Sequence, residues 1–235
     1  MMNVDLQDLT PLEIHVWRVP LIATVHEIAT LSHCLSKGEE ERLDRFSSHL
    51  ARDRRCVAWG SLRFILARYL DCSPREIQIV REGLGRPEIS YPNAAGLSFS
   101  LSHSEDFGLV AVSNNAVGVD IERVDPKIDA ERVAERFFSP GESEKLRGLP
   151  RDEKTVAFFR LWVLKEAYLK AHGETVPAGL SKYEFALEPN GPCLCGSDFE
   201  AMSNVCVLAE IPVSTGYVAA LAGLQEKASI SIFDL

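Results

Sequence analysis

The chain has 235 residues, of which 46% are hydrophobic and 25% charged, and its formal net charge is −9. These proportions exclude a disordered, collagen-like or coiled-coil chain as the dominant description. The acidic balance argues against a general nucleic-acid binder, and no apolar run approaches the roughly 20 residues that span a bilayer. Because the first residues do not read as a signal peptide and the six cysteines are irregularly spaced, we expect a cytoplasmic protein with reduced thiols.

The first half of the chain predicts both strands and helices. Alternating or short apolar runs predict strands at residues 13–19, 77–80, 97–101 and 108–113. A capping box at Ser36 and Glu39 begins a charged helix over residues 35–45, and an apolar stripe at helical spacing predicts a longer helix over residues 52–70. Glycines and a proline indicate a loop over residues 82–87, and Asn114-Asn115 indicates a turn, where we place a boundary.

The second half predicts a similar mixture. Its expected strands are residues 117–123, 183–187, 205–211 and 217–221. Its expected helices are residues 130–137, a segment capped by Ser139, and residues 152–172. Helices beside short strands in both halves predict an α+β fold, in which residues 1–114 and residues 115–235 meet across a cleft.

Two carboxylates on one strand give the sharpest chemical signal. In Val117-Gly-Val-Asp-Ile-Glu122 the apolar residues point to one face, and Asp120 and Glu122 point to the other. The two negative charges repel each other unless a cation lies nearby, and Mg²⁺ prefers carboxylate and phosphate oxygens as ligands. The alternative is a solvated strand face paired to Arg123 or Lys127.

A helical segment over residues 159–170 carries further charges. Glu166 and Lys170 are i,i+4 neighbours, Lys165 is one step round the helix, and Trp162 lies one turn before Glu166. In the functional interpretation Glu166 joins the two strand carboxylates and the lysines face phosphate. The alternative is a surface salt bridge on an amphipathic helix.

Arginines are concentrated in an otherwise acidic chain. Seven of them lie between residues 42 and 68, and arginine binds phosphate bidentately; the alternative is a basic solvated helix face. Ser102-His103-Ser104 at a strand end reads either as part of a Ser-His hydrolase or as a polar cradle for phosphate, and Gly-x-Ser-x-Gly is absent. Gly85-Arg86-Pro87 is a rigid turn that presents an arginine.

Taken in chain order, these motifs resemble the Sfp-type 4′-phosphopantetheinyl transferases. The order is Arg55-x4-Gly60, Gly85-Arg-Pro87, Phe99-Ser-Leu-Ser-His-Ser104, Val117-Gly-Val-Asp-Ile-Glu122, Arg136-Phe-Phe-Ser139 with Glu142, and Leu161-Trp-x-x-Lys-Glu-Ala-Tyr-x-Lys170. The resemblance covers roughly residues 12–190. It implies two similar α/β halves related by pseudo-twofold symmetry in a monomer, with coenzyme A nucleotide bound by the first half and the metal and catalytic helix in the second.

The resemblance also implies the reaction and its partners. The 4′-phosphopantetheine arm of coenzyme A would be transferred to a serine hydroxyl of an apo carrier protein, with Mg²⁺ as cofactor and 3′,5′-ADP as the other product. The partners would be an acyl carrier protein or the carrier domains of polyketide or nonribosomal peptide synthases. Fatty-acid and lysine-pathway carriers stay open, and neither nucleic acid nor a membrane is expected as a partner.

The resemblance assigns roles residue by residue. The metal would be held by Asp120, Glu122 and Glu166, and the catalytic residues would be Glu166 as base, Lys170 and Asp120. The coenzyme A contacts would be Arg42, Arg55, Arg86, Ser102, His103, Lys165 and Lys170, with Arg55 and His103 at the 3′-phosphate. Glu142 is a weaker candidate near the cleft. The chain departs from the family pattern at Glu39, where relatives carry a basic residue, at Arg86, where lysine is commoner, and in the loop over residues 173–180.

Two other functions use the same residues. One is a metal-dependent phosphohydrolase that would cleave coenzyme A without a carrier protein. The other is a non-catalytic binding module whose arginines hold an acidic protein or a nucleotide. A pure anion-binding surface gains nothing from three carboxylates, which counts against the binding module, and the missing histidine-rich metal cluster counts against the hydrolase.

Overall fold

The structure is a computed structural model that describes residues 9–81, 83, 85–94, 96–175, 179–195 and 206–235. The elements up to residue 113 are β1 (Glu13–Pro20), α1 (Val25–Ser32), α2 (Lys37–Leu43), α3 (His49–Leu70), β2 (Gln78–Arg81), β3 (Pro87–Tyr91), β4 (Ser98–Ser104) and β5 (Phe107–Ser113). The later elements are β6 (Val117–Arg123), α4 (Ala130–Phe137), α5 (Pro140–Arg147), α6 (Arg151–His172), β7 (Glu184–Glu188), β8 (Gly191–Cys195), β9 (Val207–Glu210), β10 (Tyr217–Gly223) and β11 (Ser229–Asp234).

One order of elements occurs twice along the chain. β1 is followed by three helices, the β2–β3 hairpin, β4 and β5, and β6 is followed by three helices, the β7–β8 hairpin, β9 and β10. The strand pairings repeat as well, because β5 lies between β1 and β4, and β10 lies between β6 and β9, all antiparallel. This confirms the expected α+β fold of two similar, pseudo-twofold-related halves. The last strand, β11, pairs in parallel with β1 and so returns to the first sheet.

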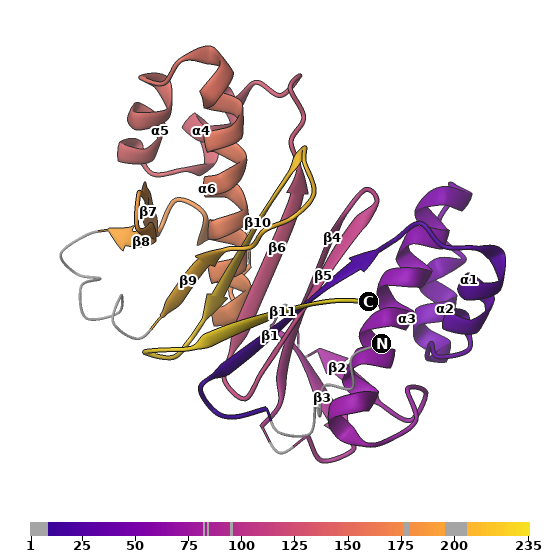
Figure 1. Cartoon of the computed structure of the whole chain (residues 1–235). Coiled ribbons are helices and arrows are strands. Elements are labelled where there is room, and N and C mark those ends of the chain that lie inside the picture. The colour runs from indigo at the N-terminus through magenta and orange to yellow at the C-terminus, as the bar shows by residue number, and fades with distance from the viewer. Residues whose placement is uncertain (1–8, 82, 84, 95, 176–178, 196–205) are drawn as a thin grey trace.

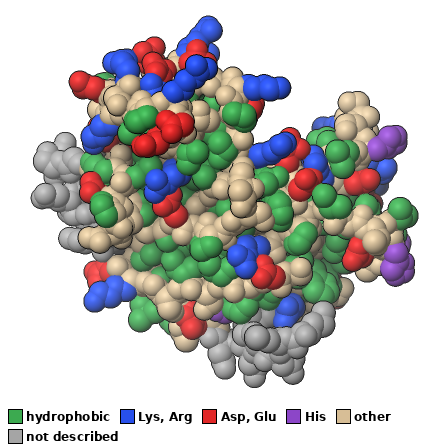
Figure 2. Space-filling model, turned by 45° about the horizontal axis from the view of Figure 1, so that its top comes forward, with side chains coloured by type: hydrophobic (Ala, Val, Ile, Leu, Met, Phe, Trp, Pro, Cys, Tyr) green, Lys and Arg blue, Asp and Glu red, His purple; other side chains and the backbone are tan. Residues whose placement is uncertain are grey.

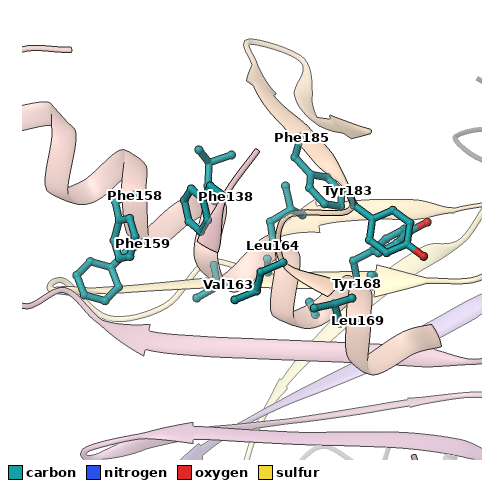
Figure 3. Close-up of a cluster of buried hydrophobic side chains, with 14 of the residues drawn as sticks. Phe138, Phe158, Phe159, Val163, Leu164, Tyr168, Leu169, Tyr183 and Phe185 are labelled. Atoms are coloured by element: carbon teal, nitrogen blue, oxygen red, sulfur yellow. The ribbon is translucent and has the colours of Figure 1, made fainter. Parts of the chain in front are cut away.

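The two sheets lie between two groups of helices, with α1–α3 beside one sheet and α6 beside the other (Figure 1). Alternation along each strand builds this arrangement. In β5, Val110 and Val112 pack in the core shared with α3, whereas Leu109 and Ala111 pack in the core that holds Val119 of β6. A third core lies beneath α6, where aromatic side chains converge (Figure 3).

Several elements differ from the sequence predictions. The helix α1 was not predicted; it is only eight residues long, begins with a capping box at Thr24 and Glu27, and contacts the core through partly buried side chains such as Ile28 and Leu31. The helix α3 begins at His49, three residues earlier than predicted, because Ser48 caps it. The strand β4 continues through the polar segment to Ser104, and the strands β3, β8 and β11 were also not predicted. The predicted strand over residues 205–211 is β9, and residue 205 lies outside the described residues, as do 82 and 84 of the predicted loop. Among the described residues, none of the helices is both long and apolar enough to traverse a bilayer.

Candidate active site

A charged cluster lies between β6 and α6. The Lys170 ammonium nitrogen is 2.6 Å from Oδ1 of Asp120 and 3.9 Å from Oε2 of Glu166. The Asp120 side chain is 2% exposed, whereas that of Lys170 is 28% exposed, so the cluster opens to solvent on the lysine side. The positive charge that the two strand carboxylates require is therefore supplied, in the protein alone, by Lys170.

Glycine at position 118 allows α6 to lie directly on β6. A Cβ atom added there would be 2.0 Å from the carbonyl oxygen of Ala167 and 2.6 Å from the amide nitrogen of Ala171. Because β6 side chains alternate, the face that carries Gly118 also carries Asp120 and Glu122. The close approach of the helix thus brings Glu166 and Lys170, which are one turn apart, to the two carboxylates.

Three serines of β4 connect the first half to β6, two of them through the same carboxylates. Ser102 Oγ donates to Oδ1 of Asp120 at 2.6 Å, and Ser104 Oγ donates to Oε2 of Glu122 at 2.7 Å. Ser100 Oγ accepts from the amide of Val119 at 3.1 Å. The three residues alternate along β4 and therefore point the same way. The cluster lies at the junction of the two halves.

Burial changes the proton affinity of the carboxylates. Desolvation and, second, the negative charge of Asp120 raise the pKa of Glu166 to about 7, although Lys170 lowers it. Desolvation likewise raises the pKa of Glu122, against the hydrogen bond from Ser104. Glu166 is therefore chemically suited to exchange a proton near neutral pH.

The donor set of the cluster fits a hard divalent cation. Oδ2 of Asp120 is buried and has no hydrogen-bond partner, which leaves a carboxylate oxygen free to coordinate. In the described part of the chain, no three acidic, histidine or cysteine side chains are grouped closely enough to hold a metal ion as they stand. The ammonium group of Lys170 already forms an ion pair with Oδ1 of Asp120. A metal ion at that oxygen would have to replace this ion pair.

The predicted nucleotide contacts form a second group on α2, α3 and β4. Arg42 and Arg55 both lie over the Trp59 ring, each with its guanidinium carbon 5.4 Å from the ring centroid. Burial lowers the pKa of Arg55. His103 lies between the two groups: burial, the charge of Arg55 and that of Lys170 lower the pKa of His103 to about 4.

Arg86 lies where the β2–β3 region meets the end of α6. Its Nη1 donates to the carbonyl oxygen of Ala171 at 3.2 Å, and Gly173 faces its backbone. Arg86 also lines a hollow of about 300 Å³ that runs along Pro87 to Ile89 and Leu97 to Ser98. At a different place on the surface, a notch separates the part that contains α4–α6 from the part that contains α1–α3 (Figure 2). The segment 176–178 of the expected 173–180 loop lies outside the described residues.

Lys165 does not join either group, contrary to its predicted place among the coenzyme A contacts. Its side chain is 1% exposed and its ammonium lies 2.7 Å from Oε2 of Glu142, which is 0% exposed. It also donates to the carbonyl oxygens of Leu180 and Tyr183. The ammonium of Lys165 also lies over the rings of Phe138 and Phe185, so its charge supports the fold. Figure 3 shows these two rings in the core beneath α6. Glu142 is likewise a buried partner of Lys165 rather than a cleft residue.

The roles assigned residue by residue from the sequence left out two residues that the structure places in these groups. Ser104 binds Glu122, and its signal was the strand alternation that it shares with Ser102. Trp59 contacts both arginines, and its signal was the i,i+4 spacing from Arg55 on one helix face.

The chain resembles proteins of known activity. Residues 116–222 match the 4′-phosphopantetheinyl transferase superfamily, and residues 22–115 match the N-terminal region of 4′-phosphopantetheinyl transferases. The 4′-phosphopantetheinyl transferase HetI of Nostoc is 41% identical over 77% of this chain and 76% of its own length. The enzyme Sfp of Bacillus subtilis is 26% identical over 78% of this chain and 79% of its own. A holo-(acyl-carrier-protein) synthase from Bacillus anthracis, crystallised with coenzyme A (3′,5′-ADP), is 22% identical with a TM-score of 0.39, covering 48% of this chain and 96% of that one.

Proposed function

The chain belongs to the 4′-phosphopantetheinyl transferase superfamily, and on this premise we propose that the cluster around Asp120 is its catalytic centre. The enzyme transfers the 4′-phosphopantetheine group of coenzyme A to a serine hydroxyl of an apo carrier protein and releases 3′,5′-ADP. The observation that supports the site is the convergence of Asp120, Glu166 and Lys170 at the junction of the two halves.

The cluster offers the groups that this transfer needs. The serine oxygen forms a bond to the β-phosphorus of coenzyme A while the bond to the 3′,5′-ADP oxygen breaks. Such a reaction depends on positioning and on neutralising charge more than on a protein nucleophile. Glu166 accepts the proton of the serine hydroxyl, and Lys170 stabilises the negative charge that develops on the phosphate oxygens.

Asp120, Glu122 and Glu166 are the residues proposed to hold Mg²⁺. When bound, the ion would polarise and neutralise the pyrophosphate. Ser102 and Ser104 orient Asp120 and Glu122 through the hydrogen bonds described above. The unpartnered Oδ2 of Asp120 supports this assignment. Release of Lys170 from Asp120 would then leave its ammonium free for the phosphate.

The nucleotide end of coenzyme A is proposed to bind in the first half, within residues 1–114. Arg55 and His103 hold the 3′-phosphate, Arg42 and Arg86 flank the nucleotide, and Ser102 contacts its phosphates or adenine. Because His103 is neutral near pH 7, it contributes a hydrogen bond rather than a charge. Residues 115–235 provide the metal ligands and the catalytic helix.

The partners are proposed more broadly. We expect a monomer acting in the cytoplasm on an acyl carrier protein or on carrier domains of polyketide or nonribosomal peptide synthases. Carrier domains are commonly acidic, and the net charge of −9 repels them at long range. Recognition therefore depends on a local basic or apolar surface.

The proposal is tested by intact-protein mass spectrometry of apo carrier proteins mixed with the enzyme, coenzyme A and Mg²⁺, with EDTA as the control. We expect one phosphopantetheine to be added to the carrier only when Mg²⁺ is present. Asp120→Asn should abolish this transfer, whereas Asp234→Asn, at an exposed ion pair with Arg18, should leave it unchanged. Coenzyme A consumed without modification of any carrier would identify a phosphohydrolase instead. Full activity of Asp120→Asn would refute the metal and catalytic assignment.

A further inference from the structure

Two guanidinium groups share one aromatic side chain beside the proposed nucleotide site. Arg42, near the end of α2, and Arg55, in α3, both lie over the ring of Trp59 at 5.4 Å. The ring of Phe46 lies 5.8 Å from the Arg55 guanidinium carbon. All of these separations are within the range of about 6 Å over which a cation is attracted to a ring face.

Neither arginine is neutralised by an acid. Within the residues that the structure describes, no carboxylate forms an ion pair with Arg42 or Arg55, although the neighbouring Arg54 pairs with Glu105 and Asp106. The guanidinium group of Arg42 donates instead to the carbonyl oxygen of Gly38, from Nε at 2.9 Å. Arg55 is half-buried, so its charge is partly desolvated without a compensating anion.

An aromatic partner has a different effect from a carboxylate. Ring contacts of this kind attract a guanidinium group and restrict its side chain without cancelling its charge. The guanidinium donors stay available, and the entropy of ordering them has already been lost before a ligand arrives. Two such guanidiniums on one ring suit a phosphomonoester, which carries close to two negative charges and several acceptor oxygens.

We propose that Trp59 is a positioning and specificity-determining residue: its indole orders Arg55 at the 3′-phosphate of coenzyme A and holds Arg42, which flanks the nucleotide, within reach of the same phosphate. The inference rests on the proposed function and deepens it. Trp59 itself touches no phosphate; it acts through the two arginines. Its loss should therefore weaken binding of ligands that carry the 3′-phosphate and spare ligands that lack it.

The test compares 3′,5′-ADP with 5′-AMP by isothermal titration calorimetry, using Trp59→Met, which fills the volume without a ring face, and Trp59→Phe, which restores one. We expect Trp59→Met to raise the Kd of 3′,5′-ADP about tenfold and that of 5′-AMP less than twofold, and Trp59→Phe to recover most of the loss. In the transfer reaction, Trp59→Met should raise KM for coenzyme A about tenfold with kcat within twofold. Arg55→Ala should show the same selectivity with a larger loss.

A matched control removes a ring–guanidinium contact elsewhere. Phe137 lies 5.0 Å from Arg136 in the second half, and Phe137→Leu should leave the affinity for both nucleotides unchanged. Equal losses for the two nucleotides in Trp59→Met, or no loss for either, would overturn the inference. If Trp59→Met lost its native circular dichroism spectrum, Phe46→Leu, at an exposed ring, would provide the same comparison. Wild-type protein that bound both nucleotides equally would instead refute the proposed nucleotide site.

Discussion

His103 lies on β4 between two cationic side chains, Arg55 and Lys170. Burial and these two charges oppose its protonation, so the pKa of His103 falls from 6.5 to about 4. The imidazole of His103 is therefore uncharged near neutral pH. This separates two roles that the motif alone could not distinguish, since a histidine can bind phosphate either as a cation or as a neutral donor.

The lowered pKa of His103 predicts a specific acid sensitivity. The folded protein binds this proton only near pH 4, whereas the unfolded chain binds it at pH 6.5. Above pH 6.5 the imidazole is neutral in both states, and its contribution to the free energy of unfolding is fully present. As the pH falls from 6.5 towards 4, the unfolded chain binds the proton and the folded protein does not, so the free energy of unfolding decreases. Replacing His103 by Gln should remove this loss, so that the wild type loses about 1–2 kcal/mol more than His103→Gln between pH 7 and pH 5. Urea unfolding at the two pH values measures the difference, and parallel losses in both proteins would show that His103 is not desolvated.

The charged residues also show what a sequence can predict. Strand alternation placed Asp120 and Glu122 on one face, and helix spacing placed Glu166 beside Lys170. Both relations are local and hold in the structure. The same local reasoning failed for Lys165, because one step along a helix turns a side chain by about 100°. The side chain of Lys165 points to the cleft or to the core according to which face of α6 lies on β6. Gly118 determines that face through its close contact with α6, and this contact joins distant parts of the chain.

At the scale of elements, the contact between β6 and α6 has no room for a side chain at position 118. Gly118→Ala would place a methyl group against backbone atoms of Ala167 and Ala171, which cannot move aside as a side chain can. We expect a loss of about 3 kcal/mol or more in the free energy of unfolding and a loss of transfer activity, because α6 carries Glu166 and Lys170. Urea unfolding and the transfer assay measure the two effects.

A second glycine provides the control for this substitution. Gly148 has ordinary helical backbone angles, and a Cβ atom there would meet nothing closer than 3.5 Å. Gly148→Ala should therefore leave stability and activity nearly unchanged. Wild-type behaviour of Gly118→Ala would mean that α6 does not lie against β6 as described.

The buried pair of Lys165 and Glu142 ties α6 to α5. Removing one partner of a buried ion pair leaves an uncompensated charge, at a cost of about 3–5 kcal/mol. We expect Lys165→Met to lower the free energy of unfolding by this amount in urea titrations. Lys182→Met, which removes an ammonium that is 53% exposed and pairs with Glu174, should cost less than about 1 kcal/mol. Unchanged stability of Lys165→Met together with weaker coenzyme A binding would return Lys165 to the nucleotide site.

Two elements of the second half were predicted nearly to their ends. The helix α6 is long, rich in apolar residues and free of glycine and proline, and the strand β6 alternates apolar and polar residues. The helix α1 escaped prediction because none of its residues is buried. The strand β11 also escaped, since its residues are only partly buried and its partner β1 lies at the opposite end of the chain.

At the scale of the whole molecule, one core belongs to both halves. Val16 and Ala111 from the first sheet pack with Val119 and Leu221 from the second, and all four side chains are fully buried. The strand β11 adds residues of the second half of the chain to the first sheet, and the β4 serines bind β6. Neither half alone buries the apolar side chains of this shared core. The proposed site lies at the junction of the halves, so the shared core holds its residues in place.

This sharing predicts that the halves unfold together rather than as two domains. Trp17 lies in the core of the first sheet and Trp162 against the core beneath α6, so each reports on one half. Two single-tryptophan proteins isolate these signals, one carrying Trp59→Phe and Trp162→Phe, the other Trp17→Phe and Trp59→Phe. Within each protein, the urea midpoint from fluorescence should coincide with that from far-ultraviolet circular dichroism. A fluorescence midpoint displaced from the circular dichroism midpoint by about 1 M, in opposite directions for the two reporters, would mean that each half is stable without the shared core.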